Sequence, residues 1–183
     1  MAGGANLLLD MKTATGRHFY QFYKGREDFF RFSIPFLRHG LESGEACLWI
    51  VSQAIGIAEA IHAFGRECDL ELFLDRGQLT ILPAEKWYFD RGRFSERKVL
   101  QKTKSFVEDK TRLGFGAVRG VGDAGWLEKK DWVPFQEYEE RAHQLIQNFG
   151  KITAICAYPI QRCSLTQTKD VLIHHDSVFQ HKL

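Results

Sequence analysis

In Gly114-Phe-Gly-Ala-Val-Arg-Gly-Val-Gly-Asp-Ala-Gly-Trp126, an apolar run ends abruptly in glycines. The run over 115–121 predicts a buried strand, and its end carries Arg119, Asp123 and Trp126. Open α/β sheets bind ligands outside the carboxyl ends of their strands. A cation, a carboxylate and an indole at such an end therefore predict a small-molecule pocket, although they do not by themselves make up a reaction.

The chain on either side of this stretch alternates between strand and helix patterns. Apolar runs predict further strands over 46–51, 79–82 and 152–158. The helical spacing of apolar residues predicts helices over 26–43, 53–65, 95–113, 131–149 and 166–174. Strands that are apolar throughout are typical of parallel sheets covered on both faces. We therefore predict an α/β fold, with a mostly parallel sheet and helices on both of its faces.

Length and composition suit one soluble domain. Residues 1–16, rich in Gly and Ala, predict a flexible leader, and 17–183 predict a single domain. The 25 basic and 23 acidic side chains are dispersed, whereas a nucleic-acid interface concentrates basic residues on one face. The stretch Leu7-Leu-Leu9 is too short for a signal peptide or a membrane span. The cysteines form no C-x-x-C pair, which favours reduced thiols and a cytoplasmic location.

One glycine pattern resembles a nucleotide motif without its context. Gly120-Val-Gly-Asp-Ala-Gly125 matches G-x-G-x-x-G, but no apolar-periodic helix begins at Gly125 and no acidic residue ends a later strand at the required distance. We interpret it as a turn that lets a ligand or a loop approach the backbone. A Walker A motif is absent, which argues against P-loop ATP hydrolysis and leaves residual nucleotide binding open.

The sequence also offers no recognisable catalytic arrangement. It lacks the nucleophile elbow G-x-S-x-G, and no Ser-His-Asp or Cys-His set can be assigned. Cys156, Cys163, His174 and His175 lack the paired spacing usual for zinc. His18 lies in the segment before the first helix, where its imidazole could change charge near neutral pH or simply be hydrogen-bonded. We therefore predict no enzyme activity, no metal and no cofactor.

Short blocks along the chain resemble those of one family. They are His18-Phe-Tyr-Gln-Phe-Tyr23 with Glu27, Phe36-Leu-Arg-His-Gly-Leu-Glu-Ser-Gly-Glu45, Gly77-Gln-Leu-Thr-Ile81, Trp87-Tyr88, Gly92-Arg-Phe94, Gly114-Phe115 with Arg119, Gly122-Asp-Ala-Gly-Trp126, Tyr138-Glu139, Ile155-Cys-Ala-Tyr158 and His175. Their order and spacing over 17–179 resemble the MEDS domain, a sensory module named for methanogens, methylotrophs and a dichloromethane-responsive regulator.

The resemblance implies a RecA-like three-layer sandwich, related to KaiC-type ATPases but lacking their P-loop. It also implies a module of prokaryotic signal transduction that senses simple hydrocarbon derivatives. Members of the family usually carry an output domain, and this chain shows no kinase or helix-turn-helix pattern. We therefore expect it to signal through a separate protein, a kinase or a transcription regulator, and leave a homodimer open. Tyr20, Ala124 and Ala157 depart from the family pattern, which could change the shape of the pocket and hence the identity of the ligand.

We expect the ligand in one hollow at the carboxyl ends of the strands, beyond residues 51, 82, 121 and 158. Trp126 and Tyr158 would supply its walls, and Arg119, Asp123 and His18 would orient a polar group. The resemblance adds Tyr23, Tyr138, Glu139, Cys156 and His175 to this ligand-binding set.

Two alternatives stay open. Arg119 and Asp123 could pair with each other, because a buried arginine needs a partner. The domain could also be a RecA-like nucleotide-binding relic, or an interaction module that regulates kinases or transcription without a ligand.

Overall fold

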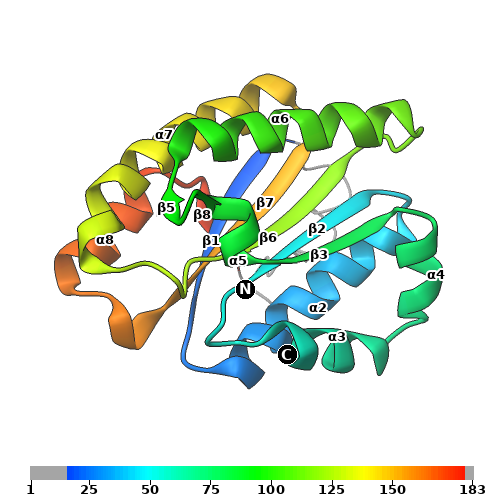
Figure 1. The fold of residues 1–183 in the computed structure, drawn as a ribbon, viewed down its shortest axis with the longest axis horizontal. Helices are drawn as coiled ribbons and strands as arrows, with labels where there is room; N and C mark the ends of the chain where they lie inside the picture. Colours follow the sequence, from blue (N-terminus) through cyan, green and yellow to red (C-terminus); the bar gives the residue numbers. More distant parts are fainter. Residues whose placement is uncertain (1–15, 180–183) are drawn as a thin grey trace, which may run out of the picture.

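The computed structural model describes residues 16–179, which form three layers around a central sheet (Figure 1). The strands of this sheet are β1 (Arg17–Tyr23), β2 (Ala46–Val51), β3 (Leu79–Pro83), β6 (Val118–Asp123), β7 (Ile152–Pro159) and β8 (Ser177–Val178). Their order is β3-β2-β6-β7-β1-β8, and each neighbouring pair is parallel. The leader expected over 1–16 lies outside the described residues, apart from Gly16.

Helices cover both faces of the sheet, which confirms the predicted α/β fold (Figure 1). One face carries α2 (Arg26–Glu42), α3 (Ile57–Gly65) and α4 (Leu70–Asp75). The other carries α5 (Ala84–Tyr88), α6 (Glu96–Arg112), α7 (Trp132–Phe149) and α8 (Leu165–Ile173). Short elements complete the fold: β4 (Phe89–Asp90), β5 (Arg93–Phe94), and the 3-10 turns η1 (Lys129–Asp131) and η2 (Ile160–Arg162).

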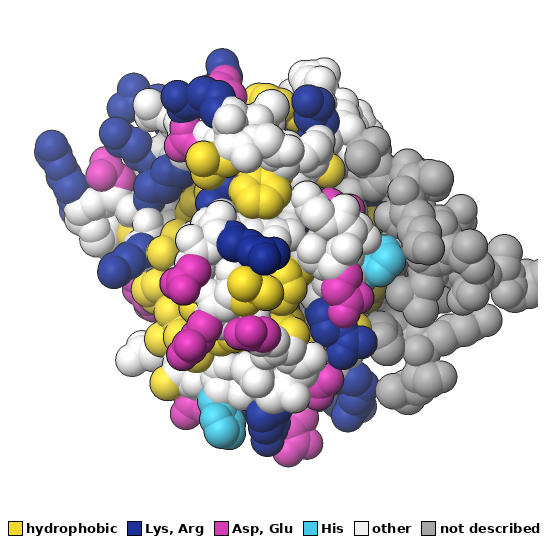
Figure 2. Space-filling model, turned by 90° about the vertical axis from the view of Figure 1, so that its right-hand side faces the viewer, with side chains coloured by type: hydrophobic (Ala, Val, Ile, Leu, Met, Phe, Trp, Pro, Cys, Tyr) yellow, Lys and Arg dark blue, Asp and Glu magenta, His cyan; other side chains and the backbone are white. Residues whose placement is uncertain are grey.

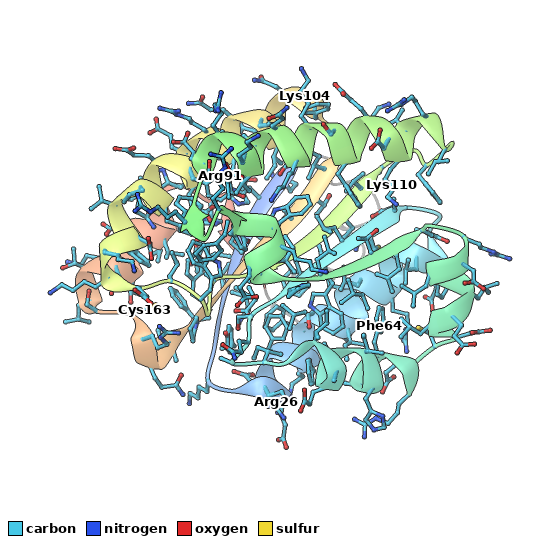
Figure 3. All side chains as sticks on the ribbon, in the orientation of Figure 1. Arg26, Phe64, Arg91, Lys104, Lys110 and Cys163 are labelled. Atoms are coloured by element: carbon cyan, nitrogen blue, oxygen red, sulfur yellow. The ribbon has the colours of Figure 1, made fainter. Side chains whose placement is uncertain are left out.

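Strand β2 shows why an uninterrupted apolar run marks a central parallel strand. Cys47 and Trp49 pack into the core on the α2 face, whereas Leu48 and Ile50 pack into the core below α5 and α7. On the α2 face, the ring of Phe64 from α3, labelled in Figure 3, lies 5.5 Å from Trp49. Since both faces of the strand meet helices, every residue of β2 is buried.

The strand predicted over 115–121 is shifted along the chain. Gly114 has a φ of +93°, and the amide of Phe115 donates to the carbonyl of Lys110, so this segment is still the turn out of α6. The strand begins at Val118 and continues to Asp123 through Gly122, which pairs in register with strands on both sides. Gly120 and Gly122 therefore lie inside a strand, and the interpretation of Gly120–Gly125 as a turn was wrong for them.

The segment around His18 is also different from the expectation. Residues 17–23 form β1, which lies between β7 and β8 in the sheet rather than leading loosely into the first helix. The sequence Arg-His-Phe-Tyr-Gln-Phe-Tyr has the aromatic content of a strand but no continuous apolar run. Its pairing with β7 joins residues more than a hundred positions apart, which local patterns cannot reveal.

The surface carries charges of both signs. Figure 2 shows Lys and Arg side chains interspersed with Asp and Glu on one face of the molecule, in keeping with a formal net charge of +2. Among the helices of residues 16–179, none combines the length and the apolar character that crossing a membrane requires.

Candidate functional site

The ten residues predicted to bind a ligand lie in three places rather than around one hollow. His18, Tyr138, Glu139, Cys156, Tyr158 and His175 lie on the face of the sheet covered by α7 and α8. Tyr23, Arg119 and Asp123 lie on the α2 face or at the carboxyl end of β6. Trp126 lies beyond β6, among the aromatic rings of α5, β5 and α7.

Arg119 connects the sheet to α2 and to the segment that follows it. Its Nε and Nη2 donate to the two carboxylate oxygens of Glu45 at 2.7 and 2.9 Å, and its Nη1 donates to the carbonyl of Phe36 at 3.2 Å. Gly40 makes room for it, because a Cβ at that position would lie 2.9 Å from Arg119 Cδ. The alternative that Arg119 pairs with Asp123 was therefore wrong, since its partner is Glu45.

Asp123 links the carboxyl ends of three strands, β1, β2 and β6, through hydrogen bonds. Its Oδ1 accepts from the hydroxyl of Tyr23 at 2.7 Å and from the amide of Gly125 at 2.8 Å, and its Oδ2 accepts from the amide of Ser52 at 2.9 Å. Burial raises the pKa of Asp123, and these hydrogen bonds oppose that shift. The carboxylate is fully buried, and both of its oxygens already accept hydrogen bonds. It therefore holds the ends of these strands together, and we call this arrangement the Asp123 clasp.

A second buried polar group is the cluster of His18, Glu139, Cys156 and His175, which we call the HECH cluster. His18 Nε2 lies 3.2 Å from Cys156 Sγ and 3.3 Å from Glu139 Oε2. Glu139 Oε2 lies 3.4 Å from His175 Nε2 and accepts from the Cys156 thiol at 3.5 Å. These residues come from β1, α7, β7 and the turn after α8, so the fold brings four separate elements to one point.

Burial governs the protonation of the HECH cluster. Desolvation raises the pKa of Glu139 to about 8 and raises the pKa of the Cys156 thiol well above its usual value. It lowers the pKa of His175 to about 4, and it lowers the pKa of His18, with further lowering from the His175 and His143 imidazoles. By themselves these side chains are therefore mainly uncharged at neutral pH.

A cavity of about 70 Å³ lies between the sheet and the layer of α5, α6 and α7. Its floor comes from β2, β6 and β7, where Gly120 and Gly122 present no side chain. Helix α6 contributes Leu100, Thr103 and Phe106 to its roof. His18 and Cys156 also line it, so this inner cavity adjoins the HECH cluster. A mostly apolar lining with a few polar groups is typical of small-molecule sites.

Aromatic rings close the inner cavity toward the end of β6. The hydroxyl of Tyr88 lies over Gly122, where an added Cβ would be 2.5 Å from it. Trp126 packs against Tyr88, with ring centroids 4.9 Å apart, and against Phe94 and Phe135. Trp126 does not line the cavity itself, but it packs against Tyr88, which does.

A larger surface groove, of about 750 Å³, lies at the carboxyl ends of β6 and β7, beside η2 and α8. It is nearest to the hollow expected from the sequence, but of the ten predicted residues only Tyr158 lines it. Arg162 donates to the carbonyls of Gly125 and Leu127, and the Trp132 indole donates to Asp170. Cys163, labelled in Figure 3, lines this groove and is not part of the HECH cluster. Because these polar groups in the groove already have partners, the inner cavity is the better candidate site.

The predicted ligand-binding set missed the residues of α5 and α6 that line the inner cavity, among them Trp87, Tyr88, Leu100 and Thr103. The family resemblance included Trp87 and Tyr88 but gave them no role. A helical stripe that faces a core and one that faces a pocket have the same period, so the pattern of α6 could not separate them. The available signal was the pair Gly120 and Gly122, because glycine inside a strand often marks a place where a ligand or another group approaches closely.

Comparison with known proteins identifies the family. The family described as "MEthanogen/methylotroph, DcmR Sensory domain" (MEDS) matches residues 17–176. The chain is similar to the transcriptional repressor DcmR of Methylorubrum extorquens (strain DSM 6343 / CIP 106787 / DM4), with 27% identity over 157 residues. That alignment covers 84% of this chain and 56% of the relative, so the chain spans little more than half of the repressor's length. The protein therefore belongs to the MEDS family of sensory domains.

Proposed function

We propose that this protein senses a small, largely apolar molecule that binds in the inner cavity beside His18 and Cys156. The observation that carries the proposal is the direct contact between an apolar cavity and a buried polar cluster. A cavity of about 70 Å³ has roughly half the volume of an engineered apolar cavity of about 150 Å³ that takes up benzene or xenon. The ligand is therefore a molecule of a few heavy atoms.

The lining indicates the chemical class of that molecule. Leu48, Ile50 and Phe106 favour a hydrocarbon or halocarbon body, while the His18 and Cys156 end favours one polar or polarisable substituent. A simple hydrocarbon derivative such as a halomethane or a short alcohol combines the two. The family description, which refers to methylotrophs and to DcmR, supports the same class.

The cavity lies under α6 and α7, so ligand binding can be transmitted to the surface through these two helices. A ligand that fills the cavity stabilises the conformation in which both helices pack against the sheet, and it shifts the population toward that conformation. The outer surface of this layer would then present a different face to a partner. The relative's name, transcriptional repressor, supports a partner that regulates transcription.

Nucleotide binding receives less support from the geometry. The connection from β1 to α2 consists only of Lys24 and Gly25, whereas a phosphate-cradling loop needs a longer glycine-rich segment between strand and helix. Gly120 and Gly122, the other candidate glycines, lie within β6.

The test pairs two glycine-to-alanine variants with a panel of ligands. Gly120 pairs with Leu48 and Ala154, which line the cavity, so a Cβ at Gly120 would enter it, with Leu48 O at 3.9 Å as its nearest neighbour. Gly116 is the matched control, because a Cβ there meets nothing within 4 Å and lies outside the cavity lining. Thermal shift and calorimetry are run with halomethanes, short alcohols, methylamines and ATP–Mg²⁺.

We expect at least one small organic ligand to raise the melting temperature of the wild type by mass action. Gly120→Ala should weaken its binding by about 10-fold or more, the effect of one methylene group in a fitted pocket, and Gly116→Ala should not. Equal affinity in all three proteins would place the ligand elsewhere. A melting-temperature rise with ATP–Mg²⁺ alone would replace the proposal with nucleotide binding.

A further inference from the structure

The HECH cluster has the composition of a metal centre. It combines two imidazoles, one thiol and one carboxyl group, and one potential ligand atom of each lies within 4.8 Å of all the others. All four residues are buried, with exposed fractions of 1% for His18, 0% for Glu139, 8% for Cys156 and 8% for His175. Polar groups this deep require compensation, because their burial without a partner is costly.

The spacing of the ligand atoms agrees with tetrahedral coordination. Zinc bonds of about 2.0 Å to nitrogen or oxygen and about 2.3 Å to sulfur place two ligands of a tetrahedron roughly 3.3–3.6 Å apart. Four of the six separations among the ligand atoms are 3.2, 3.3, 3.4 and 3.5 Å, and all four atoms lie within 4.8 Å of one another. A zinc ion at the centre would therefore need only small side-chain movements.

The hydrogen bonding around His175 orients it as a ligand. Its Nδ1 donates to the carbonyl of Val171 at 2.6 Å, which directs the lone pair of Nε2 toward Glu139. A hydrogen bond from the ring nitrogen that does not bind the metal is the usual support of a metal-binding histidine. Within residues 16–179, Nε2 itself has no hydrogen-bond partner, although it is buried.

We propose that His18, Glu139, Cys156 and His175 bind one zinc ion. Binding releases the protons of the Cys156 thiol and of any protonated Glu139 to solvent, since a metal takes the deprotonated forms. A thiolate, a carboxylate and two neutral imidazoles then balance the charge of Zn²⁺, so the filled site carries no net charge. Calcium and magnesium do not fit this set, because they prefer oxygen ligands.

The zinc site does not depend on a ligand in the inner cavity. An ion at this point would join β1, α7 and β7 to the turn after α8, and it would do so whether or not the cavity takes up a ligand. The four ligands lie at positions 18, 139, 156 and 175. Because they are far apart in the sequence, no short metal-binding motif indicates the site.

The test uses the whole chain. Metal content is measured on the purified protein, and again after chelation and reloading with Zn²⁺ or with Co²⁺, whose charge-transfer absorption reports a thiolate ligand. Cys156→Ser and His175→Asn remove ligands. The matched controls are Cys163→Ser and His143→Asn, because His143 lies one helical turn from Glu139 and bonds Gln147 instead.

We expect about one zinc ion per chain, a cobalt–thiolate band, and loss of that band in Cys156→Ser but not in Cys163→Ser. Each ligand variant should lose at least the roughly 10- to 100-fold in affinity that a supporting hydrogen bond contributes, while His143→Asn keeps wild-type affinity. Folded wild-type protein that takes up neither metal from a stoichiometric excess would overturn the proposal. So would wild-type metal affinity in both ligand variants.

Discussion

The hydroxyl of Tyr23, at the end of β1, donates a 2.7 Å hydrogen bond to Asp123, at the end of β6, across a separation of 100 positions. With the amides of Ser52 and Gly125, it satisfies a carboxylate that has no exposed surface. This clasp fixes the carboxyl ends of the strands. Tyr23 and Asp123, which the sequence suggested as ligand-binding residues, therefore stabilise the fold instead.

Tyr23→Phe should destabilise the protein without affecting ligand binding. The substitution removes one hydrogen bond to a buried acid, and bonds to charged groups contribute about 1.5–3 kcal/mol. Urea denaturation measures the loss, and calorimetry with the ligand of the wild type measures affinity. A variant with unchanged stability but lost ligand affinity would show that Tyr23 contacts the ligand.

Glu45→Ala should destabilise the protein because it leaves the Arg119 guanidinium buried without its partner. Breaking a fully buried pair costs about 3–5 kcal/mol, and we expect the lower end because the Glu45 side chain remains 18% exposed. The control is Glu42→Gln, which removes an exposed partner of Arg38 and should change stability by less than about 1 kcal/mol. Equal effects in the two variants would mean that Arg119 finds another partner.

Replacement by alanine should affect stability differently at two glycines of the same motif. A Cβ at Gly125 would lie 2.6 Å from Ser52 Oγ and 2.9 Å from Tyr23 Oη, so Gly125→Ala should lose about 1–3 kcal/mol through overpacking. Gly120→Ala meets no such contact and should be neutral or gain up to about 1 kcal/mol from reduced unfolded-state entropy. Thermal denaturation of both variants checks this order, and the reverse order would mean that the end of β6 is packed differently.

Chelation should lower the melting temperature of the wild type, since a metal that binds only the folded state stabilises it by mass action. Adding Zn²⁺ back should restore the original value. Cys163→Ser should behave like the wild type, whereas Cys156→Ser should respond to neither treatment. A melting temperature that chelation leaves unchanged, in protein shown to have lost its zinc, would limit the ion to a role other than stability.

Local patterns predicted the layers of this fold well. The run over 46–51 indicated a strand buried on both faces, and the long helices end within a few residues of the expected positions. They did not predict β1, because its place depends on pairing with β7 from the other end of the chain. Pairing of that kind is set by the whole sheet and not by neighbouring residues.

The candidate site was less predictable for geometric reasons. Arg119 and Asp123 share one strand, yet four residues of extended chain separate them by roughly 13 Å, so they meet different partners. The HECH cluster takes its residues from four elements. The sequence had suggested Cys156 and His175 as possible zinc ligands, but in a set with Cys163 and His174 and without His18 or Glu139. The glycines of β6 were evident in the sequence. That they form the floor of a cavity could not be predicted, because the cavity also requires the helices packed above them.

The most direct test of the sensory proposal is the position of a bound ligand. Crystals soaked in dibromomethane allow the bromine atoms to be located by anomalous scattering. We predict a peak in the inner cavity, between Gly120, Thr103 and Cys156. A peak confined to the outer groove beside Arg162, or an inner cavity that stays without bromine at a concentration that raises the melting temperature, would contradict the proposal.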